Sequence, residues 1–265
     1  MKLITPAERT VAEKDFREVW GSKMARSTII VMPLVMVILL PVVYLVIIYT
    51  VPASEMNGVD QMMKLLPPEA AGFDLRQSMF YMMVNVICPM FFLMVPLMCS
   101  SVSAACSFVG ERERGTLETL LLTPLSLKQI FKAKVLGCVF LSAVTTAISF
   151  AAFTVVISVG DILLGMPFFL NWNWLVLILL LSPGVTVFGV IFMVLISGRS
   201  KSYTESVQTS GYLVLPLVLL FLGQFTGLFQ LNALILLLVS LCVVAADVPL
   251  WMVAARSFRP EKLLR

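Results

Sequence analysis

Few side chains in this sequence are able to do chemistry, and four of them are consecutive. They are Glu111, Arg112, Glu113 and Arg114, in a chain of 265 residues of which 60% are hydrophobic and only 13% are charged. The chain contains no His, which removes the usual general base and the commonest zinc ligand. It also has no phosphate-binding glycine motif, nucleophile elbow or zinc signature. We therefore expect no catalytic residue and no metal site.

The charge run is followed by the pattern of a short amphipathic helix. Gly115 offers a break, Thr116 can cap a new helix, and Glu118 lies in its first turn, where a carboxylate favours the positive helix end. Pro124 ends this helix because proline cannot continue the hydrogen-bond ladder. Its apolar stripe is formed by Leu117, Leu120 and Leu121. The pattern leaves two interpretations open, a solvated loop between membrane spans and a docking element on which a soluble partner pushes.

Six apolar segments predict an all-α integral membrane protein. Each is continuous and long enough to cross a bilayer core of about 30 Å, unlike the alternating pattern of a membrane barrel. They are residues 28–49, 78–107, 127–159, 174–196, 207–229 and 231–254. The second and third exceed the bilayer thickness, so we expect them to protrude on the side of the charge run. Ser126 and Gln129 form a capping box that opens the third, and the fifth and sixth are close enough in sequence to predict a tight hairpin.

The basic residues are distributed unevenly between the two sides of the predicted bundle. All but Lys64 and Arg76 of the 19 Lys and Arg residues lie near the termini, in the region 108–134 or between the fourth and fifth spans. The positive-inside rule places that side, with both termini and the charge run, in the cytoplasm. We thus expect a multi-pass protein of the cytoplasmic membrane with one sizeable external loop, over residues 51–77.

The sequence divides into an N-terminal amphipathic helix, a membrane domain and a tail. These three parts are residues 1–27, 28–254 and 255–265. Thr5 and Pro6 give a strong start signal for a helix over residues 5–24. One face of this helix holds Ala12, Phe16, Val19 and Trp20. We expect it to lie at the membrane surface with Trp20 at headgroup level, with a small soluble docking helix as the alternative.

Polar side chains inside the predicted spans are candidates for a translocation path. Asp247 is about five residues from the cytoplasmic end of the sixth span, where a carboxylate is costly unless it is paired or protonated. Snorkelling to the interface or a water-filled vestibule is the alternative explanation for it. Asn85 and Gln224 either line the same path or join helices to one another.

Residues 111–126, with the sequence ERERGTLETLLLTPLS, resemble the signature of ABC-2 type permeases, the membrane subunits of ATP-driven exporters. The likeness extends over nearly the whole chain, because that family has six spans, cytoplasmic termini and an N-terminal interfacial helix. Residues 200–216 and 254–264 further resemble the sodium-efflux-type branch. This chain lacks the large external domain that some members of that branch carry after the first span.

The resemblance implies a transport subunit without an ATPase site of its own. It implies a homodimer, or a heterodimer with a related permease, in the lipid bilayer above two separate ATPase subunits. Within a coupling region over 108–126, residues 116–122 would be the coupling helix, held in a groove of the ATPase. Glu111, Arg112 and Glu113 would form a polar hinge beside it. No cofactor is expected on this chain, because ATP and Mg would bind the partner ATPase, and no nucleic acid is expected.

Two other functions are compatible with the residues. One is an ion-coupled carrier or membrane-embedded enzyme that uses Asp247, and the other is a structural membrane anchor. The substrate stays open among sodium, a drug or peptide, and a lipid-like molecule, and the apolar path slightly favours an amphipathic cargo.

Overall fold

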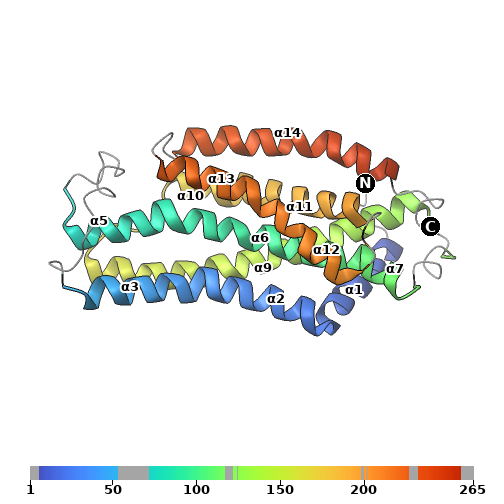
Figure 1. Ribbon diagram of the computed structural model, residues 1–265, viewed down its shortest axis with the longest axis horizontal. Coiled ribbons are helices and arrows are strands. Elements are labelled where there is room, and N and C mark those ends of the chain that lie inside the picture. Colours follow the sequence, from blue (N-terminus) through green and yellow to red (C-terminus); the bar gives the residue numbers. More distant parts are fainter. Residues whose placement is uncertain are drawn as a thin grey trace.

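The computed structural model of the chain is a bundle whose regular elements are all helices in the residues that it describes (Figure 1). The described residues are 6–52, 72–116, 122–123, 125–197, 200, 202–226 and 232–257. Within them, 6 helical runs are long and apolar enough to cross a membrane. They are Lys23–Thr50, Leu75–Glu113, Leu127–Leu164, Trp172–Ser197, Tyr203–Gln224 and Ala233–Ala255. The all-α class with six membrane spans is therefore confirmed, and the second and third spans are the longest, as predicted.

Most spans consist of shorter α-helices separated by a π-helical or 3-10 helical turn. The first consists of α2 (Lys23–Pro33), η1 (Leu34–Leu39) and α3 (Leu40–Thr50). The second consists of α5 (Leu75–Met82), η4 (Met83–Ile87), α6 (Cys88–Ala104), η5 (Ala105–Val109) and α7 (Gly110–Glu113). The third and sixth are the single helices α9 (Leu127–Leu164) and α14 (Ala233–Ser257). The fourth consists of α10 (Trp172–Val176), η6 (Leu177–Leu181) and α11 (Ser182–Ser197), and the fifth of α12 (Tyr203–Thr209), η7 (Ser210–Leu213) and α13 (Val214–Phe225).

Proline accounts for three of the wide, π-helical turns in these spans. Pro41, Pro89 and Pro183 each stand two residues after the end of one of them, namely η1, η4 and η6. A proline has no N–H to donate and its ring crowds the carbonyl four residues earlier, so the helix widens just before it. The π-helical turn η5, which leads into α7 and the charge run, is followed by no proline. Such turns are frequent at functional sites.

The second span is the centre of the bundle, where α6 packs against α2, α9 and α11 (Figure 1). In its most apolar stretch 67% of the residues are buried, compared with 17% in the sixth span. Gly189 of α11 lies so near α6 that a β-carbon on it would be 2.4 Å from Ser100 Oγ and 3.4 Å from the Leu97 carbonyl oxygen. A glycine at this crossing therefore lets the two helices approach closely.

The sixth span lies at the edge of the bundle. α14 packs along α11 and η6 more than along α13, and the tight hairpin between the fifth and sixth spans stays a prediction. The residues that join them, 227–231, lie outside the described part of the chain. Large apolar side chains are exposed on the outer face of α14, among them Leu234, Leu237, Leu238, Leu241 and Val248. Such a face is stable in contact with acyl chains, as expected of a multi-pass membrane protein.

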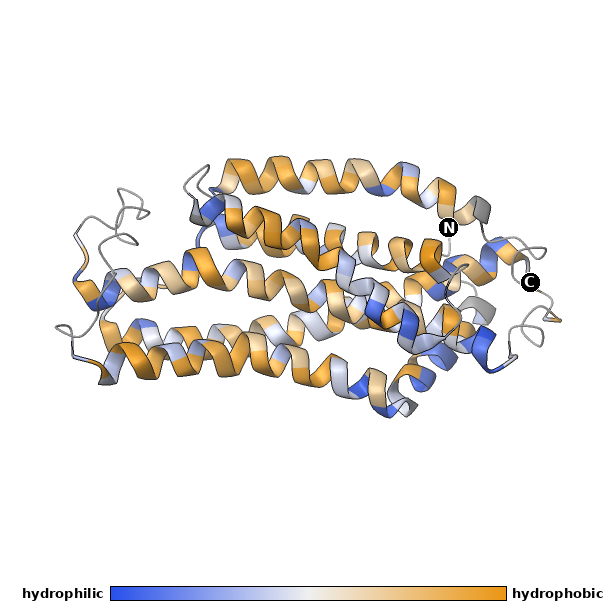
Figure 2. Ribbon diagram, viewed as in Figure 1, coloured by the Kyte–Doolittle hydropathy of each residue, from blue (hydrophilic) through white to orange (hydrophobic). Residues whose placement is uncertain are grey.

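Hydrophilic residues gather at the end of the bundle that carries α1 and α7, which we call the charged end (Figure 2). There α1 (Pro6–Gly21) crosses the long axis of the bundle and packs against α9. Its start at Pro6 agrees with the prediction. Of the four residues predicted to share the apolar face, Phe16 and Trp20 are 47% and 43% exposed and Ala12 is half-buried. The residues buried against the bundle are Val11, Asp15 and Val19. The apolar stripe and the buried face therefore share Val19 only, and the buried face includes Asp15, whose carboxylate has polar partners inside the bundle.

Gly189→Ala should destabilise the protein by about 1–3 kcal/mol, because the new methyl group forces α6 and α11 apart. Thermal unfolding of the purified protein in detergent measures this loss. Gly211→Ala is the matched control, since nothing lies within 4 Å of a β-carbon there, and we expect it to leave the unfolding midpoint unchanged. Equal effects of the two substitutions would contradict the close crossing.

Candidate functional site

The charge run ends the second span, and its first member is the most deeply buried. Glu111 lies in α7 with none of its side chain exposed to solvent. Glu111 is therefore not part of a solvated loop, which was one of the two interpretations of the sequence. A carboxylate can be buried in this way only when it is paired and hydrogen-bonded.

Two lysines pair with Glu111, and one of them joins it to α1. The Oε2 atom of Glu111 lies 2.9 Å from Nζ of Lys134 on α9, and its Oε1 atom accepts a hydrogen bond from Lys14 of α1. The Lys134 ammonium also donates to the Ser107 carbonyl oxygen over 2.9 Å and lies 3.4 Å from both carboxylate oxygens of Asp15. The Ser107 hydroxyl donates to Asp15 Oδ2 over 2.6 Å. We call these residues the ion cluster.

The ion cluster is electrically balanced, because its two carboxylates meet two ammonium groups. A buried charge that loses its partner is strongly destabilising. Burial raises the pKa of Asp15, against the opposing effects of the Lys134 charge and the hydrogen bond from Ser107. Partial burial lowers the pKa of Lys14, but the hydrogen bond and the charge of Glu111 outweigh it, so the pKa of Lys14 is raised. Helix α1 is thus held to the second and third spans by charges as well as by packing.

Arg112 and Glu113 join the end of the second span to two further helices. Nη1 of Arg112 donates a hydrogen bond of 3.2 Å to the carbonyl oxygen of Ser197, at the C-terminus of α11. Oε2 of Glu113 accepts a hydrogen bond of 2.9 Å from the backbone N–H of Tyr203, at the N-terminus of α12. Each charge has the sign that its helix end favours, a cation at the C-terminus and an anion at the N-terminus. The charge run therefore contacts α1, α9, α11 and α12.

Gly115 ends the charge run in a left-handed turn, with a φ of 69°. Its N–H donates to the carbonyl oxygen of Arg112 over 3.2 Å, and the N–H of Thr116 donates to that of Glu111 over 3.0 Å. This pair of hydrogen bonds is a common way to stop a helix with glycine, so the predicted break is confirmed. The Thr116 hydroxyl also donates to the Glu111 carbonyl oxygen over 3.3 Å.

The short helix predicted after this turn lies outside the described residues. The same holds for five residues whose predicted roles stay predictions, namely Leu117, Glu118, Leu120, Leu121 and Pro124. Beyond them the chain enters α9 at Ser126, whose hydroxyl accepts from the Gln129 N–H while the Gln129 side chain accepts from the Ser126 N–H. The predicted capping box is therefore confirmed.

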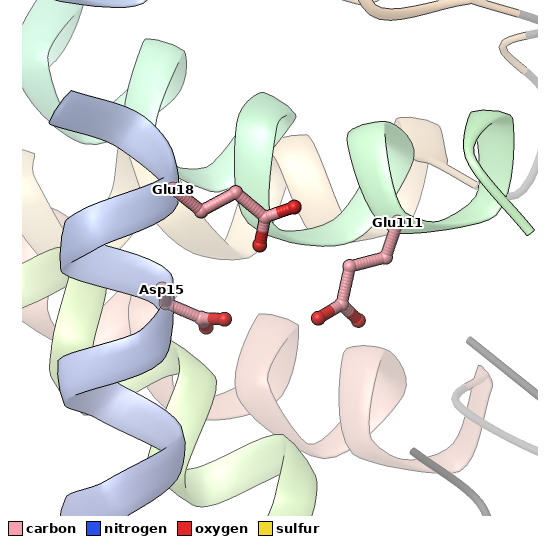
Figure 3. A group of neighbouring side chains, drawn as sticks. All are labelled: Asp15, Glu18 and Glu111. Carbon is pink, nitrogen blue, oxygen red and sulfur yellow. The ribbon is translucent and has the colours of Figure 1, made fainter. Parts of the chain in front are cut away.

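Three carboxylates converge between α1 and α7. Figure 3 shows Asp15 and Glu18 of α1 and Glu111 of α7 directed toward one another, with one oxygen of each within 4.8 Å of the others. Such a group can hold a cation, but cationic side chains of the protein already pair with it. They are Lys14, Lys134 and Arg114. The arrangement is a junction of ion pairs that can hold α1, α7 and α9 in register.

The residues predicted for a translocation path lie apart from the ion cluster and in different helices. Asn85 of η4 accepts a hydrogen bond of 2.7 Å from Asn171, which in turn caps α10 by accepting one of 3.1 Å from the Trp174 N–H. Asn85 therefore joins helices at the end of the bundle opposite α1. Gln224 of α13 and Asp247 of α14 are both buried, and each has an oxygen without a hydrogen-bond partner in the described part of the chain.

Asp247 stands eight residues before Ala255, where the sixth apolar helical run ends, which is about 12 Å along a helix. Its side chain is buried against the bundle, with only 7% of the residue exposed. A carboxylate in this position is costly, and residues of this kind mark ion, proton or substrate sites in membrane proteins.

Sequence reasoning missed Asp15, Ser107 and Lys134. Counting charges on each side of the membrane treated Lys134 like the exposed lysines around it, although it is fully buried. The spacing did contain a signal for Asp15, which is four residues from both Val11 and Val19 and so shares their buried face. No comparable signal marks Ser107.

The family model described as ABC-2 family transporter protein matches residues 9–243 of the chain. The matched stretch begins within α1 and ends within α14, so it contains the charge run and all the residues of the ion cluster. No curated protein matches the chain.

Lys134→Met should lower the free energy of unfolding by about 3–5 kcal/mol, because it leaves Asp15 and Glu111 buried with one cation fewer. Denaturant or thermal unfolding in detergent measures the loss, and adding Glu111→Gln should recover part of it. The control is Lys128→Met, at an exposed lysine of the same helix, with an expected change within about 0.5 kcal/mol. If the two methionine variants were equally stable, the ion cluster would not be what holds α1 in place.

Proposed function

The chain belongs to the ABC-2 family of transporter proteins, and we propose that it is the permease subunit of an ATP-driven exporter. In this proposal the chain itself hydrolyses nothing. Two separate ATPase subunits, each binding ATP and Mg, supply the energy, and two copies of this chain or one copy and a related permease enclose the path. The charged end faces the cytoplasm together with both termini, as the distribution of basic residues favours.

The observation that carries the proposal is the set of contacts made by the charge run. The second span ends in the turn at Gly115, immediately after residues that contact α1, α9, α11 and α12. An ATPase that displaces residues 116–122 would therefore also move these four helices, because the side chains next to Gly115 are in direct contact with them. Glu111 is buried, and each of its carboxylate oxygens forms an ion pair with a lysine. These contacts favour a clamp, meaning a rigid joint that moves as one piece, rather than the polar hinge that the resemblance implies.

A small apolar gap lies between α6, η6, α13 and α14, with room for about one water molecule. All the side chains that line it are apolar, among them Met90, Leu93, Leu177, Leu217 and Leu236. The gap is too small to hold a cargo, so the choice of substrate rests on the apolar character of the spans. A sodium ion requires oxygen ligands in place of its water shell, which apolar side chains cannot supply. We therefore favour an amphipathic or lipid-like substrate over sodium.

One observation favours a second function, an ion-coupled carrier. The unpartnered oxygen of Asp247 at membrane depth is a place where a proton or cation can bind. This function needs no ATPase, which separates it from the first.

Arg112→Ala with Glu113→Ala should uncouple the assembled exporter, because both contacts to α11 and α12 are lost. In vesicles containing the permease and its ATPase, we expect substrate-stimulated ATP hydrolysis and transport to fall at least about tenfold, a loss of ~1.4 kcal/mol of coupling. Lys128→Ala is the control on an exposed lysine of α9. Unchanged transport in the double variant would argue against the clamp, and failure to co-purify any ATPase would argue against the exporter.

Asp247→Asn should impair transport more than assembly, because it keeps the shape of the side chain and removes its ability to ionise. Transport in vesicles and the elution profile of the purified complex measure the two effects. Normal transport in this variant would remove Asp247 from the path. Transport by the permease alone, driven by an ion gradient, would establish the carrier in place of the exporter.

A further inference from the structure

Contacts with α9 fix the orientation of α1 about its own axis. Val11 packs with Ile130 and Ala133, while a side chain on Gly137 would meet Ala12 Cβ at 3.4 Å. Because α9 begins at the charged end with Leu127, Gly137 lies about 10 Å further into the bundle than Ile130. The side of α1 that carries Ala12 therefore faces the membrane.

The ion pairs of α1 agree with this orientation. Lys14 and Glu18 lie on the side opposite Ala12, and they pair with Glu111 and Arg114, at the very end of the second span. Successive residues of a helix are 100° apart, so Phe16 and Trp20 share the side of Ala12. Both aromatic residues are thus directed toward the bilayer.

Phe16 and Trp20 form an aromatic pair without cover from the rest of the described chain. Their rings stack with centroids 6.0 Å apart and planes 6° apart, and nearly half of each residue is exposed. Tryptophan and phenylalanine in such a position are stable at the boundary between headgroups and acyl chains, where an apolar ring and a polar edge are both accommodated.

Three cations that are close in sequence to this aromatic pair have no ion-pair partner within the described residues. Arg17 on α1 and Lys23 and Arg26 in the first turn of α2 are exposed and form no ion pair there. Four cations that face the bundle differ from these three, because each of them has a hydrogen-bond or ion-pair partner. These are Lys14, Arg112, Arg114 and Lys134.

The exposed surface of the first span changes from charged to apolar. Beyond Lys23 and Arg26, its outward face continues with Ile30, Val31 and Leu34, each about half exposed. Cations followed by aliphatic side chains match the phosphate and the acyl chains of a phospholipid, and exposed aromatic rings are stable at the boundary between the two.

We propose that the corner between α1 and α2 binds anionic phospholipid headgroups, with Arg17, Lys23 and Arg26 contacting phosphate and the Phe16–Trp20 pair seated beneath it. The surface anchors α1 in the inner leaflet on one side while the ion cluster holds it to the bundle on the other. The inference goes beyond transport and requires no ATPase, so it can fail or succeed independently of the exporter.

The test uses the full chain, purified in detergent and titrated with phosphatidylglycerol or phosphatidylcholine, with bound lipid counted by native mass spectrometry. We expect the wild-type protein to prefer phosphatidylglycerol. Lys23→Gln with Arg26→Gln should weaken phosphatidylglycerol binding at least about fivefold, the effect of one surface cation, and leave phosphatidylcholine binding unchanged. Phe16→Ala with Trp20→Ala should weaken the binding of both lipids.

The matched control, Arg76→Gln with Lys128→Gln, removes two positive charges elsewhere in the chain. It should keep the preference for phosphatidylglycerol. The charge-conserving pair Lys23→Arg with Arg26→Lys should also keep it, which separates charge from folding. A wild-type protein that binds both lipids equally would overturn the proposal. So would an equal loss in the control, or a loss in the charge-conserving variant.

Discussion

The ammonium group of Lys134, buried in an apolar environment, is the constraint on which the arrangement of the charged end depends. The Lys134 ammonium donates hydrogen bonds to the Ser107 carbonyl oxygen and to the Asp15 carboxylate, and it forms an ion pair with the Glu111 carboxylate at 2.9 Å. These partners come from α1 and the second span, and Lys134 from the third. None of the three elements can shift without leaving a charge uncompensated, which is expensive where water is excluded.

The remaining contacts of the charge run are of a different kind. Arg112 and Glu113 reach α11 and α12 through backbone groups at helix ends, where exposure to solvent makes exchange with water cheaper. The bundle therefore contains a firmly joined part, made of α1 and the second and third spans, with α11 packed closely on α6. Helix α12 is attached to the charge run through the hydrogen bond from the Tyr203 N–H to Glu113 as well as by apolar packing. A transporter that alternates between states needs such a difference, because motion begins where the contacts are weakest.

Much of this fold could be predicted because membrane spans are continuous apolar runs, and the break at Gly115 and the cap at Ser126 are local signals. What could not be predicted depends on partners distant in sequence. Asp15 was given no role, and the apolar stripe with Phe16 and Trp20 was predicted to lie at the membrane surface. Only the presence of Lys134 and Ser107 at the crossing explains why α1 turns Asp15 toward the bundle. The short helix with Leu117 and Pro124 stays a prediction.

The π-helical turn η5 limits which insertions and deletions the sequence ahead of the charge run can accept. A turn of this kind contains one residue more than a regular α-helical turn, and one residue corresponds to about 100° of rotation. Without it, Glu111 would point away from Lys134, and Arg112 and Glu113 would miss the ends of α11 and α12. The number of residues between Ala104 and Glu111 is therefore more tightly constrained than their identity. Single insertions or deletions in this interval would misdirect the whole run at once, whereas apolar exchanges at its apolar positions, Ser107 excluded, would leave the directions intact.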